Sequence, residues 1–442
     1  MTRFSMLTHS SRNSNSDWRL HCCISALVVF LVALPVMSRL TGLPIDQGII
    51  FSDHPAHLDF AVRLAGNWRE CLPHPLYHVA LLLLSSGNTK ALPGIAATLL
   101  SLAVACKFYL SIRIMAPIGD STPKRSLPAG RVDNVNQDEE GNQPAIVVTQ
   151  SCPAPEVEMD SQSKRRWLAV GMGVLLMLAM PLPNWWKSGV MLGQPSPNVW
   201  HNPTAIFCMP IVLMLFAVAV RSTNSLRRTD NAITGAIFLL CTLAKPNYPL
   251  AFAPCCAVML ARQLQIHKGF NPKHWREVLE GGFVMFAPLI LMLSIQFSMT
   301  FGGDGSDSAG LEIAPFKVWS LYTPNITVSI ILGLAFPLLV AGLYPRTLRL
   351  DAYLGWAWLT LAFAMVQMIT FAESGPRWTY GNFFWGTHFS SAIVFLFSAR
   401  VLLDAPRDLR RTSCEVVLTM HACSGLRCLV RAALDPIHAS SF

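Results

Sequence analysis

The sequence predicts an all-α protein, a polytopic transmembrane helical bundle of about ten spans, and three observations support this. Of the 442 residues, 52% are hydrophobic and only 13% are charged, whereas about 25% charged residues is usual in soluble domains. The mean hydropathy is +0.42. The apolar residues also stand in long runs, several of them close to the roughly 20 residues that a helix needs to cross a bilayer. These observations exclude a soluble enzyme, a disordered chain, a coiled coil and a nucleic-acid-binding module.

Eight apolar runs are predicted to be single spans. They are 20–38, 91–113, 167–183, 204–221, 281–299, 326–344, 351–371 and 386–403. No small-residue cleavage site follows the first run, so we interpret it as a retained anchor. The run 231–262 is too long for one span and carries Lys245-Pro246-Asn247-Tyr248 at its middle, which predicts a recessed hairpin of two half-length helices. The short run 75–87 predicts a re-entrant or interfacial helix.

The net charge of +9 predicts orientation and not an acidic partner, because Lys and Arg accumulate in cytoplasmic loops. If the N-terminus is cytoplasmic, most of the 34 Lys and Arg residues fall on the cytoplasmic side and both termini lie there. The chain then divides into five parts: a cytoplasmic N-terminus (1–19), first spans (20–115) with an extracytoplasmic loop (39–90), a disordered cytoplasmic insertion (116–166), a transmembrane bundle (167–403) and a basic cytoplasmic tail (404–442). The tail could also lie on the inner leaflet.

The first candidate site residues are Asp53, His54 and His57, which open an amphipathic helix after the first span. Asp53 has two competing roles, a helix cap and a catalytic acid or base. Asp59 is expected to pair with Arg63 on the opposite face. The 12 cysteines form no CxxC pair, and we predict no cofactor. A divalent metal on Asp53 and His57 is a minority alternative, because two ligands do not make a site.

The predicted extracytoplasmic loop 193–203 supplies further candidates. Trp200 offers a flat apolar face, and Asn198, His201 and Asn202 offer hydrogen bonds, a combination that suits a sugar ring. The alternative is an interfacial Trp with loop-capping Asn side chains.

The remaining candidate substrate-binding residues are Lys245, Glu373, Arg377 and Asn382. A lone ammonium in a recessed turn is costly without an anionic partner, so Lys245 and Arg377 could together grip a phosphate. The alternatives are that Lys245 snorkels to the surface and that Glu373 simply pairs with Arg377.

Together these features resemble the polyprenyl-phosphate-dependent GT-C glycosyltransferases, polytopic membrane enzymes with an acidic motif near an amphipathic helix in their first extracytoplasmic loop. Asp53-His54 stands where that family has paired acids. The resemblance implies transfer of a sugar from a polyprenyl-phosphate-linked donor to an acceptor hydroxyl at the extracytoplasmic face of a bacterial cytoplasmic membrane, for the cell envelope. It further implies that Asp53 is the general base and that the phosphate is stabilised by Arg377 and Lys245. The acceptor would be oriented, or its proton shared, by His54, His57 and His201.

Three other functions stay open from the sequence. The interrupted run 231–262 is typical of transporters, so a transporter or flippase of a lipid-linked or anionic solute is one alternative. A surface-polysaccharide polymerase or ligase would share the lipid-linked donor. A noncatalytic membrane subunit is the third.

Overall fold

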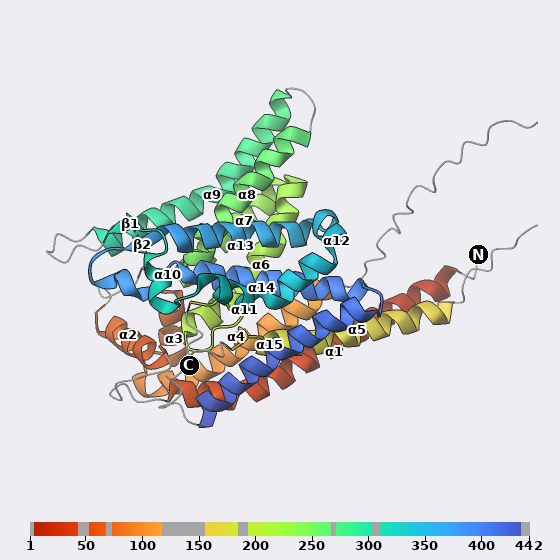
Figure 1. Ribbon diagram of the computed structural model, residues 1–442, viewed down its shortest axis with the longest axis horizontal. Helices are drawn as coiled ribbons and strands as arrows, with labels where there is room; N and C mark the ends of the chain where they lie inside the picture. The colour runs from red at the N-terminus through yellow and green to blue at the C-terminus, as the bar shows by residue number, and fades with distance from the viewer. Residues whose placement is uncertain are drawn as a thin grey trace, which may run out of the picture.

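The computed structural model describes residues 4–42, 53–67, 73–116, 155–183, 193–266, 271–302 and 310–434, and these are nearly all helical (Figure 1). Seven helical segments are long and apolar enough to cross a membrane: Ser16–Thr41, Thr89–Met115, Pro203–Ser225, Pro272–Phe301, Ile326–Leu343, Ala352–Thr370 and Arg377–Asp404. Each coincides with one of the eight predicted single spans. The structure is therefore that of a helical, multi-pass integral membrane protein.

The N-terminal part contains α1 (Phe4–Thr41), α2 (His54–Gly66), α3 (Leu76–Ser85), the 3₁₀ turn η2 (Thr89–Ala91), α4 (Leu92–Met115) and α5 (Pro155–Leu178). The middle contains α6 (Pro203–Ser225), α7 (Arg228–Ala244), α8 (Asn247–Ile266) and α9 (Pro272–Phe301). The C-terminal part contains β1 (Leu311–Ile313), α10 (Lys317–Tyr322), α11 (Ile326–Leu343), α12 (Pro345–Leu350), α13 (Ala352–Thr370), β2 (Phe371–Glu373), the 3₁₀ helix η3 (Gly375–Tyr380), α14 (Phe384–Asp404) and α15 (Leu409–Leu434).

Helix α14 lies at the centre and is almost entirely buried, in contact with α13, α8, α11, α5, α4 and α6. Its sequence suits this position because small residues allow neighbouring backbones to approach closely. At Gly386, a Cβ atom would lie 3.1 Å from the carbonyl oxygen of Asn247. The hydroxyls of Ser390 and Ser391 donate to carbonyls one turn back within α14, so they are satisfied without water.

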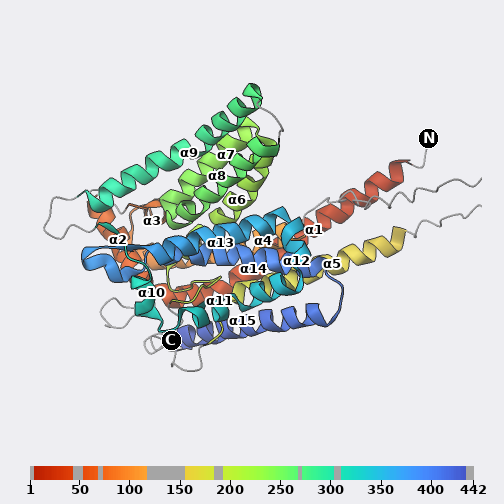
Figure 2. The ribbon, with the colours of Figure 1, turned by 45° about the horizontal axis from the view of Figure 1, so that its top comes forward.

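The hairpin predicted for 231–262 is present as α7 and α8, but its helices are not half-length. Helix α7 runs antiparallel to α6 along its length, because Asn231 contacts Ser222 at one end and Lys245 contacts Thr204 at the other. The helices are longer than predicted because α7 begins at Arg228 and α8 continues to Ile266, beyond both ends of the apolar run. In both views α7, α8 and α9 lean away from the layer of α13 and α14 (Figure 2).

The predicted disordered insertion 116–166 is wrong for its last part, because α5 begins at Pro155. Proline suits a first helical turn, and the acidic residues that follow favour the positive end of the helix dipole. Residues 117–154 of the insertion lie outside the described residues.

The segment 404–442, predicted to be a basic cytoplasmic tail, contains α15, which folds back against the bundle and contacts α5, α11 and α1. Its buried residues recur every three or four positions, at Cys414, Leu418, Ala422 and Cys428, and form one apolar stripe between the arginines. The connection from α14 is short, so α15 returns toward the end of the bundle where α2, α3 and α10 lie (Figure 1).

A small antiparallel sheet, which the sequence did not predict, joins two distant segments at that same end. Strand β1 pairs with β2 in the register Leu311 to Glu373. The pairing fixes the start of η3, and η3 leads directly into α14.

Candidate functional site

A cavity of 280 Å³ lies at the end of the bundle where α15, α10, η3, the start of α14 and the loop before α6 meet. Its lining is mixed, with several aromatic rings and a few polar side chains. The lining residues are Asp53, Met180, Pro181, Gly193, Ser196, Asn198, Val199, His201, Tyr322, Tyr380, Gly381, Phe384, Trp385, His388 and Cys428. A concave, partly apolar cavity with a few convergent polar groups is the usual form of a small-molecule site.

The only acidic residue in this lining is Asp53, and it is exposed. It directly precedes α2, with Pro55 in the first turn, but its side chain does not cap the helix. Instead Oδ2 accepts a hydrogen bond of 2.8 Å from Nδ2 of Asn202, and the backbone N–H donates to the carbonyl of His201. The carboxylate is therefore held toward the loop 193–202.

Asn202 connects Asp53 to Lys245. Its Oδ1 accepts from Nζ of Lys245 at 3.2 Å, from the hydroxyl of Thr204 and from the backbone N–H of Ala205, so it also caps α6. The ammonium of Lys245 is buried beneath Trp385, 3.9 Å from the ring centroid. Lys245 thus neither snorkels to the surface nor lines the cavity.

The two histidines of the cavity come from different elements. His201 lies 5.8 Å from Trp385, ring to ring, and His388 lies on the next turn of α14, 5.7 Å from the same ring. His388 Nδ1 accepts from the backbone N–H of Ser196, which ties the loop to α14. Burial lowers the pKa of His201, the carboxylate of Asp53 opposes this shift, and the positive charge of Lys245 adds to it. The charges of both Asp53 and Lys245 therefore act on the cavity, although the Lys245 side chain does not line it.

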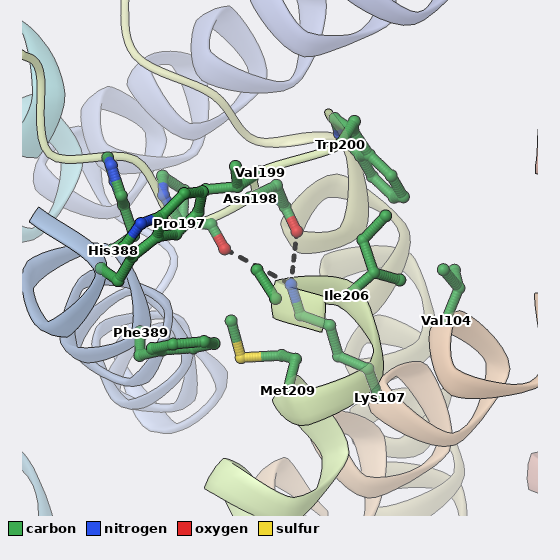
Figure 3. Close-up of a pocket in the computed structure, with 12 residues that line it drawn as sticks. Val104, Lys107, Pro197, Asn198, Val199, Trp200, Ile206, Met209, His388 and Phe389 are labelled. Atoms are coloured by element: carbon green, nitrogen blue, oxygen red, sulfur yellow. Dashed lines mark hydrogen bonds between the residues drawn. The ribbon is translucent and has the colours of Figure 1, made fainter. Parts of the chain in front are cut away.

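Asn198 anchors the loop and has little hydrogen-bonding capacity left for a ligand. Its amide nitrogen donates to the carbonyls of Leu176 and Ala179 in and just after α5, and its oxygen accepts from Lys107 of α4 (Figure 3). Lys107 also donates to the carbonyl of Pro197 at 3.4 Å. Trp200 is buried in a hydrophobic cluster with residues of α1, α3 and α4. The tryptophan that lines the 280 Å³ cavity is Trp385.

His54 and His57 point away from the cavity into the packing of α2. His54 Nε2 bonds the carbonyl of Trp200, and His57 Nδ1 lies 2.9 Å from Nε2 of His78 on α3. Burial lowers the pKa of His54 to about 4 and that of His78 to about 4. Burial and the neighbouring His78 lower the pKa of His57 to about 2. These rings are therefore neutral at physiological pH and contribute to packing.

Glu373, Arg377 and Asn382 line a smaller recess beside the main cavity. Nε of Arg377 lies 3.1 Å from Oε2 of Glu373, so these two residues form the expected i, i+4 ion pair. The carbonyl of Asn382 accepts from the Asn247 side chain and joins this recess to the α7–α8 turn. Within the described residues, no group of three or more His, Cys, Asp or Glu side chains is placed to hold a metal ion.

Of the predicted site residues, the structure brings together Asp53, His201, Asn202 and Lys245, which come from three separate segments. Sequence reasoning missed Trp385 and His388 as site residues, although both stand in the polar and aromatic segment 373–388. It also missed Lys107, whose signal was a single cation inside an apolar run.

Comparisons of the chain with protein-family models, with curated proteins and with solved structures found no match.

Proposed function

We propose that the protein is a membrane glycosyltransferase that moves a sugar from a polyprenyl-phosphate-linked donor to an acceptor hydroxyl in the 280 Å³ cavity. One observation carries this proposal. An exposed carboxylate, Asp53, faces a cavity lined by aromatic rings and is held through Asn202 by a buried cation, Lys245. A carboxylate fixed beside a surface for stacking is what a sugar acceptor and its general base require.

In the proposed step, Asp53 takes the proton of the acceptor hydroxyl as its oxygen bonds to the anomeric carbon. The bond between that carbon and the phosphate oxygen breaks, and polyprenyl phosphate leaves with the electron pair. Inversion at the anomeric carbon follows from direct displacement. Trp385 and Tyr380 supply the flat faces against which a sugar ring can lie.

Lys245 acts as a positioning residue in this proposal. Its ammonium polarises the Asn202 amide, which then donates more strongly to Asp53. Its positive potential at the cavity also favours the charge that grows on the departing phosphate. Arg377 is engaged by Glu373 in the neighbouring recess, so we give it no direct role in the transfer.

The test is Asp53→Asn in purified protein supplied with a panel of polyprenyl-phosphate sugars and membrane extract as the acceptor source, with release of polyprenyl phosphate as the readout. Removing a general base costs about a hundredfold to ten-thousandfold in rate. The matched control is Asp59→Asn on the same helix, where the carboxylate pairs with Arg63 at 3.0 Å on an exposed face. We expect the control to keep its activity. Equal release by the two variants would remove Asp53 as the base, and no release by the wild type with any donor would remove the proposed reaction.

A second variant, Lys245→Gln, tests the positioning role because glutamine can still donate to Asn202 but carries no charge. We expect a lower rate, and we expect Lys245→Arg, which keeps the positive charge, to recover part of it. Equal loss in the two variants would mean that Lys245 has only a structural role.

A further inference from the structure

A second cavity, of 230 Å³, lies at the opposite end of the bundle, between α1 and α5. In both ribbon views the first turns of α1 and α5 extend from the bundle at the end away from α2, α3 and α10 (Figures 1 and 2). The cavity is lined by Asp17, Trp18, His21, Gln162, Ser163, Arg166 and Trp167. It shares no residue with the candidate site.

The cavity combines opposite charges with two indole rings. Arg166 lies over the ring of Trp18, with its guanidinium carbon 5.4 Å from the ring centroid. Trp18 is buried and its Nε1 donates to the carbonyl of Ala116, so this ring is fixed. His21 packs edge-on against Trp167 at 5.4 Å. Asp17, His21 and Trp167 are exposed, so the cavity is open to its surroundings.

Both helices change from polar to apolar sequence at the level of this cavity. On α1 the change follows Arg19, and the next turns expose Leu20, Ile24 and Leu27. On α5 it follows Arg166, where Trp167 begins the apolar stretch. Exposed apolar side chains on a membrane helix face lipid, and Trp residues concentrate at the level of the headgroups. The cavity therefore lies where phospholipid headgroups lie.

We propose that this cavity binds the headgroup of a membrane phospholipid that carries both a phosphate and a primary ammonium. Arg166 presents a planar fork of donors to the phosphate. Asp17 accepts from the ammonium, and the exposed face of Trp167 adds a cation–π contact. One cation and one carboxylate in the lining match a zwitterion better than an anionic headgroup.

The test is native mass spectrometry of the delipidated full-length protein, titrated with phosphatidylethanolamine and, separately, with phosphatidylglycerol. A hydrogen-bonded charge is worth about tenfold to a hundredfold in affinity, so we expect Arg166→Gln to weaken phosphatidylethanolamine binding by that factor. The matched control is Arg165→Gln, which removes the neighbouring arginine, whose Nε lies 2.9 Å from Oδ1 of Asp404. Arg166→Lys should restore part of the binding, which separates loss of charge from misfolding.

Two further arms identify the headgroup and its source. Asp17→Asn should weaken binding of phosphatidylethanolamine and leave binding of phosphatidylglycerol unchanged. Phosphorylethanolamine, the soluble headgroup, should not displace the lipid at equal concentration. Equal binding by Arg166→Gln and Arg165→Gln would overturn the site. An equal effect of Asp17→Asn on both lipids would overturn the proposal that the bound headgroup is zwitterionic. Displacement by phosphorylethanolamine would overturn the proposal that the ligand is a membrane lipid.

Discussion

Replacing Gly425 by alanine tests whether α15 packs against the bundle or hangs free as a tail. A Cβ atom at this position would lie 1.6 Å from the carbonyl oxygen of Leu178 at the end of α5, and real Cβ atoms essentially never come closer than 3.0 Å to another heavy atom. Helix α15 must then move away from α5, and overpacking of this kind costs about 1–3 kcal/mol of unfolding free energy. In an unpacked helix the same change stabilises by about 1 kcal/mol. A packed α15 therefore predicts that Gly425→Ala lowers the stability, and an unpacked α15 predicts that it raises the stability.

The assay is the fraction of purified protein that stays monodisperse after heating, compared at one heating rate because membrane proteins unfold irreversibly. Gly425→Ala should lose monodispersity at a lower temperature than the wild type. The control is Gly171→Ala on α5, where nothing lies within 4 Å of the added Cβ and the change should be neutral or stabilising. If both variants are as stable as the wild type or more stable, α15 does not pack as described.

Three other predictions use the same heating assay. Asn198→Ala leaves the half-buried Lys107 without its side-chain acceptor, and leaving such a group unpaired costs about 1–3 kcal/mol, so we expect a loss of stability that Asn198→Gln does not reproduce in full. Gly235→Ala should also destabilise, because its Cβ would lie 2.7 Å from a carbonyl oxygen of α9. In the folded protein the pKa of His57 is lowered to about 2 and that of His78 to about 4, from a value of 6.5 in the unfolded chain. Between pH 6.5 and pH 4 the two rings are therefore protonated mainly in the unfolded chain. Stability should fall as the pH drops from about 6.5 to about 4, by about 1.4 kcal/mol per pH unit for each ring; an equally steep fall in His78→Gln would contradict this.

The apolar runs predicted the helical class well, because a membrane helix needs a long apolar stretch whatever its partners are. They could not locate helices whose buried surface is polar. Helix α7 begins at Arg228, before its apolar run, and near that end the buried Asn231 accepts a hydrogen bond from Ser222. Helix α15 was not predicted because its arginines lower the mean hydropathy of the segment. Its apolar stripe is too narrow to show in that average. Such helices are determined by their neighbours and not by their own composition.

Several residues of the candidate site could be predicted from the sequence, but the contacts that join them could not. The sequence singled out Asp53, Asn202 and Lys245, and the structure joins them by hydrogen bonds. Nothing in the sequence says that Trp385 covers Lys245, or that Asn198 turns inward to Lys107 and not toward a ligand. Each of these contacts depends on which residues, distant in the sequence, pack beside the polar atom. A single sequence does not give those distances.

The walls of the 280 Å³ cavity have a consequence for how the protein is made. Asp53 leaves the ribosome long before Trp385 and Cys428, which face the same space. The cavity cannot exist in a nascent chain that already has its first helices in place. A truncated product that stops before α14 therefore carries the carboxylate without the cavity, so the walls can close only after α14 and α15 have been synthesised.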